Sequence, residues 1–300
     1  MRSVGVASSG GAPSERRGTE RAPSRVEQVD IIIVSYNCRD ALDACLRSLA
    51  SAPPRRAHGI VVVDNHSADG TGAHIRSNHP AVRLIEAGGN VGFAAANNIG
   101  IRATSGELVL LLNPDTLVTP GALDRICEAL EAVPMAGVAG PRIVDNAGRA
   151  ELSYGRMVSP LSELRQKVLV AGSDRGAAWA TRAVERMTRR AQRPDWVSGA
   201  CLLIRRDVLE QAGLLDERFF MYTEDVDLCA TVRALGRDIL FVPDAEIVHL
   251  RGRSRATAPA ATNHAYRRSH VAFYEKHHPT WAKVLKLYLR LRGEWPVPGG

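Results

Sequence analysis

The sequence predicts an α/β fold with a mostly parallel central sheet and helices on both of its faces. Three observations lead to this prediction. Apolar runs that do not alternate with polar residues recur through the first 115 residues, as expected of strands buried on both faces. Segments with a helical spacing of apolar residues separate these runs, and alternation of strand and helix is typical of a parallel sheet. Each run ends in polar residues, at the edge where such sheets bind ligands.

The first part of the chain is predicted to supply four strands and three helices. The strands lie in the runs VDIIIVSYN, GIVVVDNHSADGT, VRLIEAG and ELVLLLNPD, at residues 29–37, 59–71, 82–88 and 107–115. The spacing of apolar residues predicts helices over 40–53, about 70–78 and 92–104. The carboxyl ends of parallel strands meet at one edge, so we expect the polar ends SYN, DNHSADG, GGN and NPD to converge on one crevice.

The rest of the chain is predicted to complete the sheet and to add a basic insert. A helix is expected over 120–134, and a hairpin over 141–155 that turns at Asp145 and Asn146. Residues 156–193 are rich in Ala and Arg and have a weak helical pattern. The remaining expected elements are a strand and a helix within 197–219, a helix over 221–236 with Thr223 as candidate N-cap, and two short strands around Pro243 within 237–250.

Composition and charge narrow the class of protein. The apolar fraction of 45% suits a globular protein, and no apolar run approaches the roughly 18 residues that cross a bilayer. The net charge of +7 is concentrated in residues 1–28, 156–193 and 276–300, which leaves an acidic body. This distribution argues against a nucleic-acid groove and favours segments that prefer an anionic surface. Five cysteines without paired spacing, and no signal sequence, predict a reduced, cytoplasmic protein.

Several polar residues at the predicted strand ends are candidates for ligand binding. Asp64 could accept a hydrogen bond from a nucleobase imide or a ribose hydroxyl, or it could simply cap the next helix. Residues 88–101, GGNVGFAAANNIGI, could bring a helix N-terminus close to phosphate, or their alanines could only pack against the sheet. No G-x-G-x-x-G follows the first strand, which disfavours dinucleotide binding.

Four further residues could carry metal or proton chemistry. Asp115 follows a wholly apolar strand, and one carboxylate can hold a divalent cation whose other ligands are phosphate and water. Glu224 and Asp225 open a helix, where the helix dipole is expected to keep a carboxylate ionised as a general base. The alternative is that they are ordinary acids of a first turn, as we interpret Asp207 to be. His249 ends the last predicted strand and is either structural or a ligand.

Taken in order, six segments resemble the signature segments of family 2 glycosyltransferases. They are VDIIIVSYN, VVVDNHSADGT, GGNVGFAAANNIGI, LLLNPDT, the long run from WVSGACLLIRRDVL to MYTEDVDLCATVRALG, and FVPDAEIVHLRGRS. The likeness covers about residues 29–255 and is closest to the rhamnosyltransferase-like branch of bacterial cell-wall and polysaccharide enzymes. Six motifs in the same order are a far more specific signal than any one of them.

The resemblance implies a GT-A fold and inverting transfer of a sugar, dTDP-rhamnose being the favoured donor, with Mg²⁺ or Mn²⁺. It implies that Asp225 is the catalytic base and that the metal is held by Asp115 and His249. It implies acceptor contacts for Trp196, Gly199 and Glu224, and donor contacts for Ser35, Tyr36, Asn37, Asp64, Asn65, Asn90, Asn97, Asn113 and Asp115. Asn113 stands where the family's Asp-x-Asp element has its first acid, which weakens the attraction for a metal.

On this basis the chain divides into three parts. They are a disordered leader over 1–28, a catalytic domain over 29–255 and a helical extension over 256–300. Within the catalytic domain, the donor-binding half is 29–118 and the acceptor-binding half is 119–255, with the basic insert at 156–193.

In the extension, residues 281–296 have apolar and basic residues on opposite sides of a predicted helix. Such a helix either lies in a membrane interface or packs on the domain. The expected acceptor is a lipid-linked or polysaccharide hydroxyl, and the expected location is the cytoplasm, at the inner face of the membrane if the helix binds there.

Two other functions stay open at the level of the sequence. A sugar-nucleotide pyrophosphorylase uses a related sheet, but SYNCRD stands where its Gly-rich loop is expected. A non-catalytic nucleotide-sugar-binding protein with the same fold is favoured only by Asn113.

Overall fold

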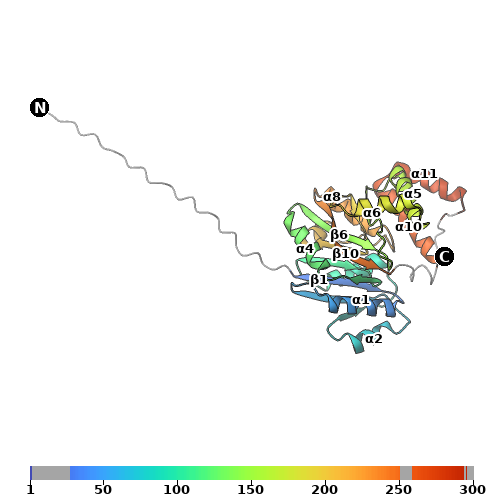
Figure 1. Ribbon diagram of the computed structural model, residues 1–300. Coiled ribbons are helices and arrows are strands. Elements are labelled where there is room, and N and C mark those ends of the chain that lie inside the picture. The colour runs from blue at the N-terminus through green and yellow to red at the C-terminus, as the bar shows by residue number, and fades with distance from the viewer. Residues whose placement is uncertain (2–27, 251–258, 294, 296–300) are drawn as a thin grey trace.

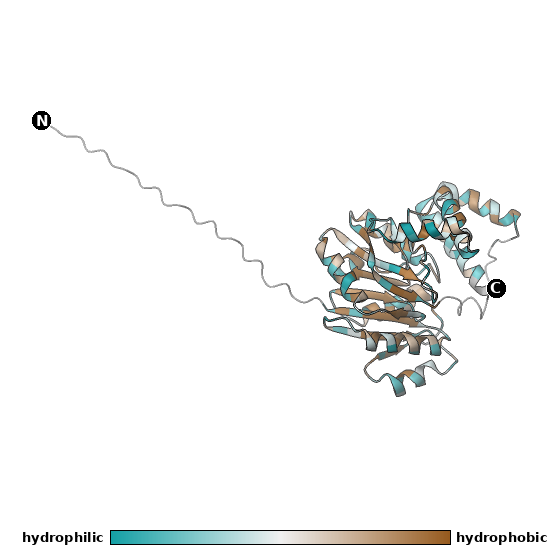
Figure 2. Ribbon diagram, in the orientation of Figure 1, coloured by the Kyte–Doolittle hydropathy of each residue, from teal (hydrophilic) through white to brown (hydrophobic). Residues whose placement is uncertain are grey.

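The computed structural model describes residues 28–250 and 259–293, with Met1 and Trp295. The predicted leader over 1–28 and the RGRS part of the last motif therefore lie almost entirely outside the described residues. Within them, an eight-stranded sheet of order β3-β2-β1-β4-β9-β6-β10-β5 forms the centre of the molecule (Figure 1). Figure 2 shows these strands as a largely hydrophobic layer between more polar helices.

The sheet is mostly parallel, as the sequence predicts. Parallel pairs join β1 to its neighbours β2 and β4, β2 to β3, and β6 to β10. The antiparallel strands are β9, between β4 and β6, and β5, at the edge beside β10. The bounds are β1 Val29–Ser35, β2 His58–Asp64, β3 Arg83–Glu86, β4 Leu108–Leu112, β5 Thr116–Val118, β6 Ala136–Val144, β9 Cys201–Arg205 and β10 Asp238–His249.

Helices cover both faces of the sheet and create two hydrophobic cores. One core packs α1 (Arg39–Ser51), α2 (Thr71–Asn78) and α4 (Ala122–Ala132) against the sheet. The other packs α3 (Phe93–Arg102), α7 (Arg206–Gln211) and α8 (Glu224–Ala234) on the opposite face. The predicted helices over 40–53, 70–78, 92–104, 120–134 and 221–236 are therefore confirmed.

The small residues of α3 allow that helix to lie unusually close to the sheet. Ala94 and Ala96 are fully buried, and a Cβ on Gly100 would lie only 2.5 Å from the Ile32 side chain. Close packing of the alanines, one of the two readings of GGNVGFAAANNIGI, is therefore confirmed.

The basic insert forms two helices, α5 (Pro160–Asp174) and α6 (Ala178–Thr188), beside the short pair β7 (Tyr154–Gly155) and β8 (Trp196–Val197). The chain ends in α10 (Pro259–His277) and α11 (Pro279–Leu291), which lie on the same side of the molecule as α5 (Figure 1). Lys276 anchors α10 to the body through ion pairs of 2.8 Å with Asp216 and Asp227. None of the helices in the described part of the chain is long and apolar enough to cross a membrane.

Two predicted elements differ from the structure. The hairpin over 141–155 is reduced to one bridge between Val144 and Ala150, although its turn forms. The Asp145 carboxylate accepts the N–H groups of Ala147 and Arg149 and so closes the turn, and the chain then leaves β6 to form β7. The two short strands around Pro243 are a single strand, β10, because both halves pair with β6. Pro243 lies in the register shift between Val242 and Glu246, where the pairing is interrupted and no ladder donor is needed.

Candidate active site

The polar ends of the first three strands lie side by side, as the sequence predicts. Ser35 and Asp64 are register partners at the ends of β1 and β2. The Asn65 N–H donates to the Ser35 carbonyl at 2.8 Å, and the Ala87 N–H donates to the Asp64 carbonyl at 3.0 Å. The backbone therefore holds the three strand ends at one edge of the sheet.

The loop after β1 is joined to the loop after β2. Asn37 has a left-handed backbone with a φ of 49°, its N–H donates to Ser67 Oγ, and its Oδ1 accepts the Ala68 N–H at 2.7 Å. Asp64 is buried, and its Oδ1 accepts the Ser67 N–H at 3.2 Å. Because α2 begins at Thr71 and no side chain caps it, Asp64 is not its cap. The half-exposed ring of Tyr36 lies beside this loop pair.

Four more of the predicted donor residues make hydrogen bonds within the protein. Asn65 Nδ2 donates to Asn90 Oδ1 at 2.9 Å, and Asn65 Oδ1 accepts the Val91 N–H. These amides thus connect the Gly-rich loop to the end of β2. Asn97 is buried within α3, where its Nδ2 donates to the Phe93 carbonyl. Ser35 is also buried, with its Oγ 3.3 Å from Cys38 Sγ.

The start of α3 lies against the segment that leads into α8. The Phe93 N–H donates to the Phe220 carbonyl at 2.6 Å. A Cβ on Gly92, whose φ is 90°, would lie 2.6 Å from the same carbonyl oxygen. Asn98, which the sequence analysis did not single out, exchanges two hydrogen bonds with the backbone of Leu215. The donor-side helix and the chain that carries Asp225 are therefore tightly connected.

Asp115 and His249 come together at the opposite part of the same edge. His249 Nε2 lies 3.2 Å from Asp115 Oδ1, and His249 Nδ1 lies 3.5 Å from Glu151 Oε2. Burial alone would lower the pKa of His249, but hydrogen bonds to Asp115 and Glu151, with their charges, outweigh it and raise the pKa to about 9. The sequence pattern does not mark Glu151, because it lies in the second arm of the reduced hairpin, where its N–H donates to the Ile143 carbonyl and nothing local indicates His249 as its partner.

Asp115 and His249 are candidate ligands for a divalent cation, because a carboxylate and an imidazole suit Mn²⁺, and Mg²⁺ through the carboxylate. Glu151 approaches the other ring nitrogen of His249, so in this arrangement it does not share one ion with Asp115. In the structure, the charge between the carboxylates is supplied by the protonated imidazole. A metal ion bound there would replace a proton that the site already attracts.

Asp225 is held by two backbone N–H groups at the start of α8. Gly199 N donates to its Oδ2 at 2.7 Å, and Val226 N donates to its Oδ1 at 2.8 Å. A Cβ on Gly199 would lie 3.1 Å from the Asp225 Cβ, so a glycine fits best here. The next residue, Ala200, accepts the Asn113 N–H at 2.9 Å. This bond places the loop before β9, whose Gly199 holds Asp225, beside the loop that carries Asp115.

Burial dominates the electrostatics of the acid pair. Burial and the neighbouring charge of Asp225 raise the pKa of Glu224 well above its ordinary value, and Glu224 Oε2 is buried without a hydrogen-bond partner. Burial also raises the pKa of Asp225, although the Gly199 and Val226 N–H groups oppose it. Desolvation therefore outweighs the helix dipole, so the pKa of each acid moves in the direction opposite to the one that the dipole alone would give.

The residues around the pair differ in role. Thr223 occupies the predicted N-cap position, but its Oγ1 donates to the Tyr222 carbonyl and does not cap α8. Tyr222 and Thr223 both have positive φ, a strained backbone of the kind that collects at functional sites. Trp196 is buried, with its indole N–H on the Arg156 carbonyl at 2.9 Å, so its ring supports the loop from beneath.

Comparisons with known proteins find related sequences. Residues 27–282 match the family described as glycosyltransferase like family 2. The chain is 33% identical over 276 residues to the N-acetylglucosaminyl-diphospho-decaprenol L-rhamnosyltransferase of Mycobacterium tuberculosis, covering 88% of this chain and 89% of that protein. It is 26% identical to a low-salt glycan biosynthesis hexosyltransferase of Haloferax volcanii, over 69% of this chain and 62% of the other.

Solved structures show the same GT-A fold. A mannosyltransferase from Pyrobaculum calidifontis, in complex with GDP-Man and Mn²⁺, superposes with a TM-score of 0.61 at 20% identity, over 87% of this chain and 69% of the other. GalNAc-T7 with UDP, GalNAc and Mn²⁺ gives a TM-score of 0.57 at 16% identity, over 75% of this chain but only 43% of its own length. At these identities the likeness establishes the fold and nothing finer.

Proposed function

Since the chain belongs to the glycosyltransferase like family 2, we propose that it moves a sugar with inversion from a nucleotide diphosphate donor onto an acceptor hydroxyl in cell-envelope glycan synthesis. We propose rhamnose from dTDP-rhamnose as the donor, because the relative from Mycobacterium tuberculosis is named an L-rhamnosyltransferase and matches along nearly its whole length. The family match leaves the pyrophosphorylase alternative without support.

The placement of Asp225 is the observation that carries this proposal. Two backbone N–H groups fix both of its oxygens, and among the described residues no side-chain cation donates a hydrogen bond to it. Its raised pKa makes it a stronger base than an exposed aspartate, nearer to the pH at which an enzyme works. Asp225 would take the proton from the acceptor hydroxyl as that oxygen attacks the anomeric carbon, and a single displacement inverts the configuration.

The donor would lie along the strand ends. Asp64, Asn37 and Tyr36, which belong to the strand ends and loops after β1 and β2, would contact the base and ribose. The diphosphate would lie towards Asn113 and Asp115. A Mg²⁺ or Mn²⁺ ion held by Asp115 and His249, with Glu151 nearby, would supply positive charge that stabilises the leaving diphosphate.

Replacing Asp225 by asparagine tests the assignment. Turnover should fall by roughly 10²–10⁴-fold, the usual scale for a lost general base, while donor affinity should change little. Asp207→Asn is the matched control, because Asp207 opens the neighbouring helix α7 and is exposed. The readouts are sugar transfer or donor hydrolysis by chromatography and donor binding by calorimetry. Full turnover in Asp225→Asn would remove this residue from the mechanism.

The same experiments separate an enzyme from a binding protein and define the donor. Calorimetry with dTDP-, UDP- and GDP-sugars, each with and without Mn²⁺, should show tightest binding of dTDP-rhamnose in the presence of metal. Tight donor binding by wild-type protein without transfer or hydrolysis under any condition would favour the non-catalytic alternative. A preference for a UDP- or GDP-sugar would reject the proposed donor while leaving the reaction class intact.

We further propose that the acceptor is lipid-linked. A cavity of about 1060 Å³ lies between the insert and the β7–β8 pair. Apolar side chains of Leu152, Met157 and Leu169 line it together with Arg156 and Arg165. Apolar walls with guanidinium groups suit a prenyl diphosphate, which has a hydrocarbon chain and a dianionic head. The cavity adjoins the acceptor loop, because the Arg156 carbonyl receives the Trp196 indole N–H.

The same chemistry suggests contact with an anionic membrane surface. Helix α11 packs on the body through Ala282 and Leu289 and leaves other apolar side chains exposed, with Trp281 at 50% and Leu291 at 80%. Leu161 of α5 is 79% exposed on the same side of the molecule. These exposed apolar side chains share α11 with Lys283, Lys286 and Arg290, as in interfacial helices. Figure 2 colours stretches of this helix as hydrophobic.

Vesicle co-sedimentation tests this surface. Wild-type protein should bind vesicles that contain phosphatidylglycerol and should be released by salt. The double variant Trp281→Ser with Leu291→Ser should bind at least about tenfold more weakly, since two interfacial anchors are lost. Met135→Ser is the control, because Met135 is equally exposed but precedes β6, away from α11. Equal binding of the double variant and the control would exclude α11 as the contact.

A further inference from the structure

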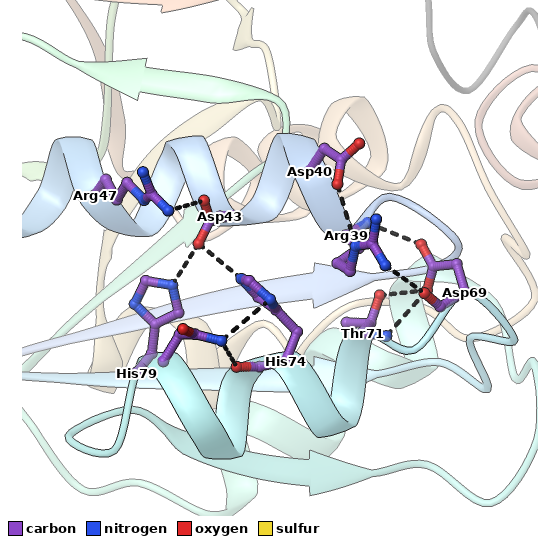
Figure 3. A network of polar contacts seen from close by, with 9 residues as sticks. Arg39, Asp40, Asp43, Arg47, Asp69, Thr71, His74 and His79 are labelled. Atoms are coloured by element: carbon purple, nitrogen blue, oxygen red, sulfur yellow. Dashed lines mark hydrogen bonds and ion pairs between the residues drawn. The ribbon is translucent and has the colours of Figure 1, made fainter.

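A second cluster of potential ligands lies away from the proposed catalytic residues, between α1 and α2. It consists of Asp43 on α1, His74 on α2 and His79, the residue that ends α2. Figure 3 shows both imidazole rings turned towards the Asp43 carboxylate. One ligand atom from each of the three lies within 4.8 Å of the others. We propose that this triad is a binding site for a transition-metal dication of the Zn²⁺ class.

The geometry of the triad is close to that of a coordination sphere. His74 Nε2 and His79 Nε2 lie 2.8 and 2.9 Å from the same atom, Asp43 Oδ1. Zinc binds imidazole nitrogen and carboxylate oxygen at about 2.0–2.2 Å, so the ligands of a tetrahedral ion are roughly 3.3–3.5 Å apart. An opening of about half an ångström would therefore admit the ion. The fourth position would be taken by water, because the triad is only half-buried.

The ligands are held in place before any metal binds. The His79 N–H donates to the Ile75 carbonyl at 2.9 Å, and the His79 carbonyl accepts the Val82 N–H at 2.9 Å. This closing turn of α2 brings two histidines five positions apart onto one side of the helix end. On the α1 side, Arg47 pairs with Asp43 Oδ2 at 2.9 Å and leaves Oδ1 for the histidines. The hydrogen bond from His74 also lowers the pKa of Asp43, against its partial burial, so the carboxylate is ionised at neutral pH.

Asn78 is the one group that must adjust. Its Nδ2 lies 3.2 Å from His74 Nδ1 and 3.0 Å from the His74 carbonyl, an arrangement in which Nδ1 accepts and Nε2 carries the proton. Metal binding at Nε2 moves the remaining proton to Nδ1, which then needs an acceptor. Asn78 is exposed and its amide can rotate to offer oxygen instead.

The donor set distinguishes this site from the one at Asp115. Two imidazoles and one carboxylate favour Zn²⁺ and its neighbours, whereas oxygen-rich sites favour Mg²⁺ and Mn²⁺. Its position suggests a structural effect on the donor side. Asp69 already joins the start of α1 to α2, because it accepts the N–H groups of Arg39 and Thr71 (Figure 3). A metal at the triad would add a second connection further along the same pair of helices.

Titration of the metal-free full-length protein with Co²⁺ and Zn²⁺ tests the inference. Wild-type protein should bind about one equivalent of Co²⁺ in excess Mg²⁺, with the intense visible absorption of a four-coordinate ion, and Zn²⁺ should displace it and raise the melting temperature. Asp43→Asn and His79→Gln should each weaken binding at least about tenfold. His58→Gln is the control, because His58 is exposed and its ring lies 3.1 Å from the Arg56 carbonyl, outside the triad.

A variant of His249 distinguishes metal binding at the triad from binding at the proposed catalytic metal site. His249→Gln should retain the Co²⁺ spectrum, because His249 lies in the other cluster. Far-UV circular dichroism of the metal-free variants confirms that each is folded. Absence of saturable Co²⁺ binding, wild-type affinity in both triad variants, or loss of the spectrum in His249→Gln would overturn the inference. The triad would then be only a hydrogen-bonded contact between α1 and α2.

Discussion

Replacing Glu163 by glutamine should loosen the contact between the basic insert and the C-terminal helices. Glu163 lies on α5 and is mostly buried. Its Oε1 accepts hydrogen bonds from His270 Nε2 and Tyr274 Oη of α10, both at 2.8 Å, and its Oε2 pairs with Lys167 at 3.0 Å. A single carboxylate therefore connects two segments that are more than 90 positions apart in the sequence.

The pKa of Glu163 sets the size of the effect. Burial alone would raise this pKa, but the hydrogen bond and charge of His270, followed by those of Lys167, lower it from 4.5 to about 2. Each tenfold change in the acid dissociation constant corresponds to 1.36 kcal/mol, so the ionised carboxylate contributes at most about 3 kcal/mol to the free energy of unfolding. Glutamine keeps one acceptor oxygen, so we expect a loss of about 1–2 kcal/mol at pH 7.

The sign of the pH dependence follows from the lowered pKa. The contribution is fully present above the unfolded pKa near 4.5 and is lost as the pH falls towards 2. The difference in unfolding free energy between wild type and Glu163→Gln should therefore be about 1 kcal/mol smaller at pH 3.5 than at pH 7. Urea unfolding followed by circular dichroism measures it, and hydrogen exchange in α10 shows where the stability is lost.

The control is Glu275→Gln on α10. Glu275 pairs with Lys286 at an exposed position, where such pairs contribute about 0–1 kcal/mol. If Glu163→Gln is no more destabilising than this control at pH 7, the proposed connection contributes nothing. A difference that does not shrink on acidification would refute the assignment to the ionised carboxylate.

Three further outcomes are expected. Gly92→Ala should lower the free energy of unfolding by several kcal/mol and reduce the soluble yield, because residue 92 has a φ of 90° and its new Cβ would collide with the Phe220 carbonyl. Asp30→Ala should lower the free energy of urea unfolding by about 3–5 kcal/mol, because it removes the carboxylate that pairs with the largely buried Arg206 guanidinium at 3.1 Å. In the absence of metal, the stability of wild type relative to His249→Gln should fall as the pH rises from 6.5 through about 9. The pKa of His249 is raised in the folded protein, so its ion pairs stabilise the fold only while the imidazole is protonated.

The sequence predicted the parts of the fold that depend on local pattern. Unbroken apolar runs such as VDIIIVSYN can only be strands covered on both faces, so the parallel sheet and the shared edge at Ser35 and Asp64 follow directly. The contact of Asp115 with His249 was expected from the resemblance and is present. In each of these cases the decisive information lies in a few adjacent residues.

The features that the sequence could not predict depend on contacts between segments that are distant in the chain. Glu151 lies close to His249 because the chain leaves β6 after the single bridge between Val144 and Ala150. Hydrophobic periodicity does not reveal this path of the chain. The raised pKa values of Glu224 and Asp225 depend on burial by distant segments, whereas the helix dipole is visible locally and suggested the opposite sign. The pairing of His74 with Asp43 likewise depends on how two helices pack.

The two acidic sites at the sheet edge differ in what their neighbours provide, and this difference assigns their chemistry. Asp115 faces an imidazole that the surrounding carboxylates keep protonated, so positive charge is already stabilised there and a divalent cation can take its place. Asp225 accepts the backbone N–H groups of Gly199 and Val226 and lies beside a second buried acid, so its environment favours uptake of a proton. The bond from Asn113 to Ala200 keeps the two environments in adjacent loops. A nucleophilic displacement needs this arrangement, with positive charge beside the leaving diphosphate and a desolvated base beside the attacking hydroxyl.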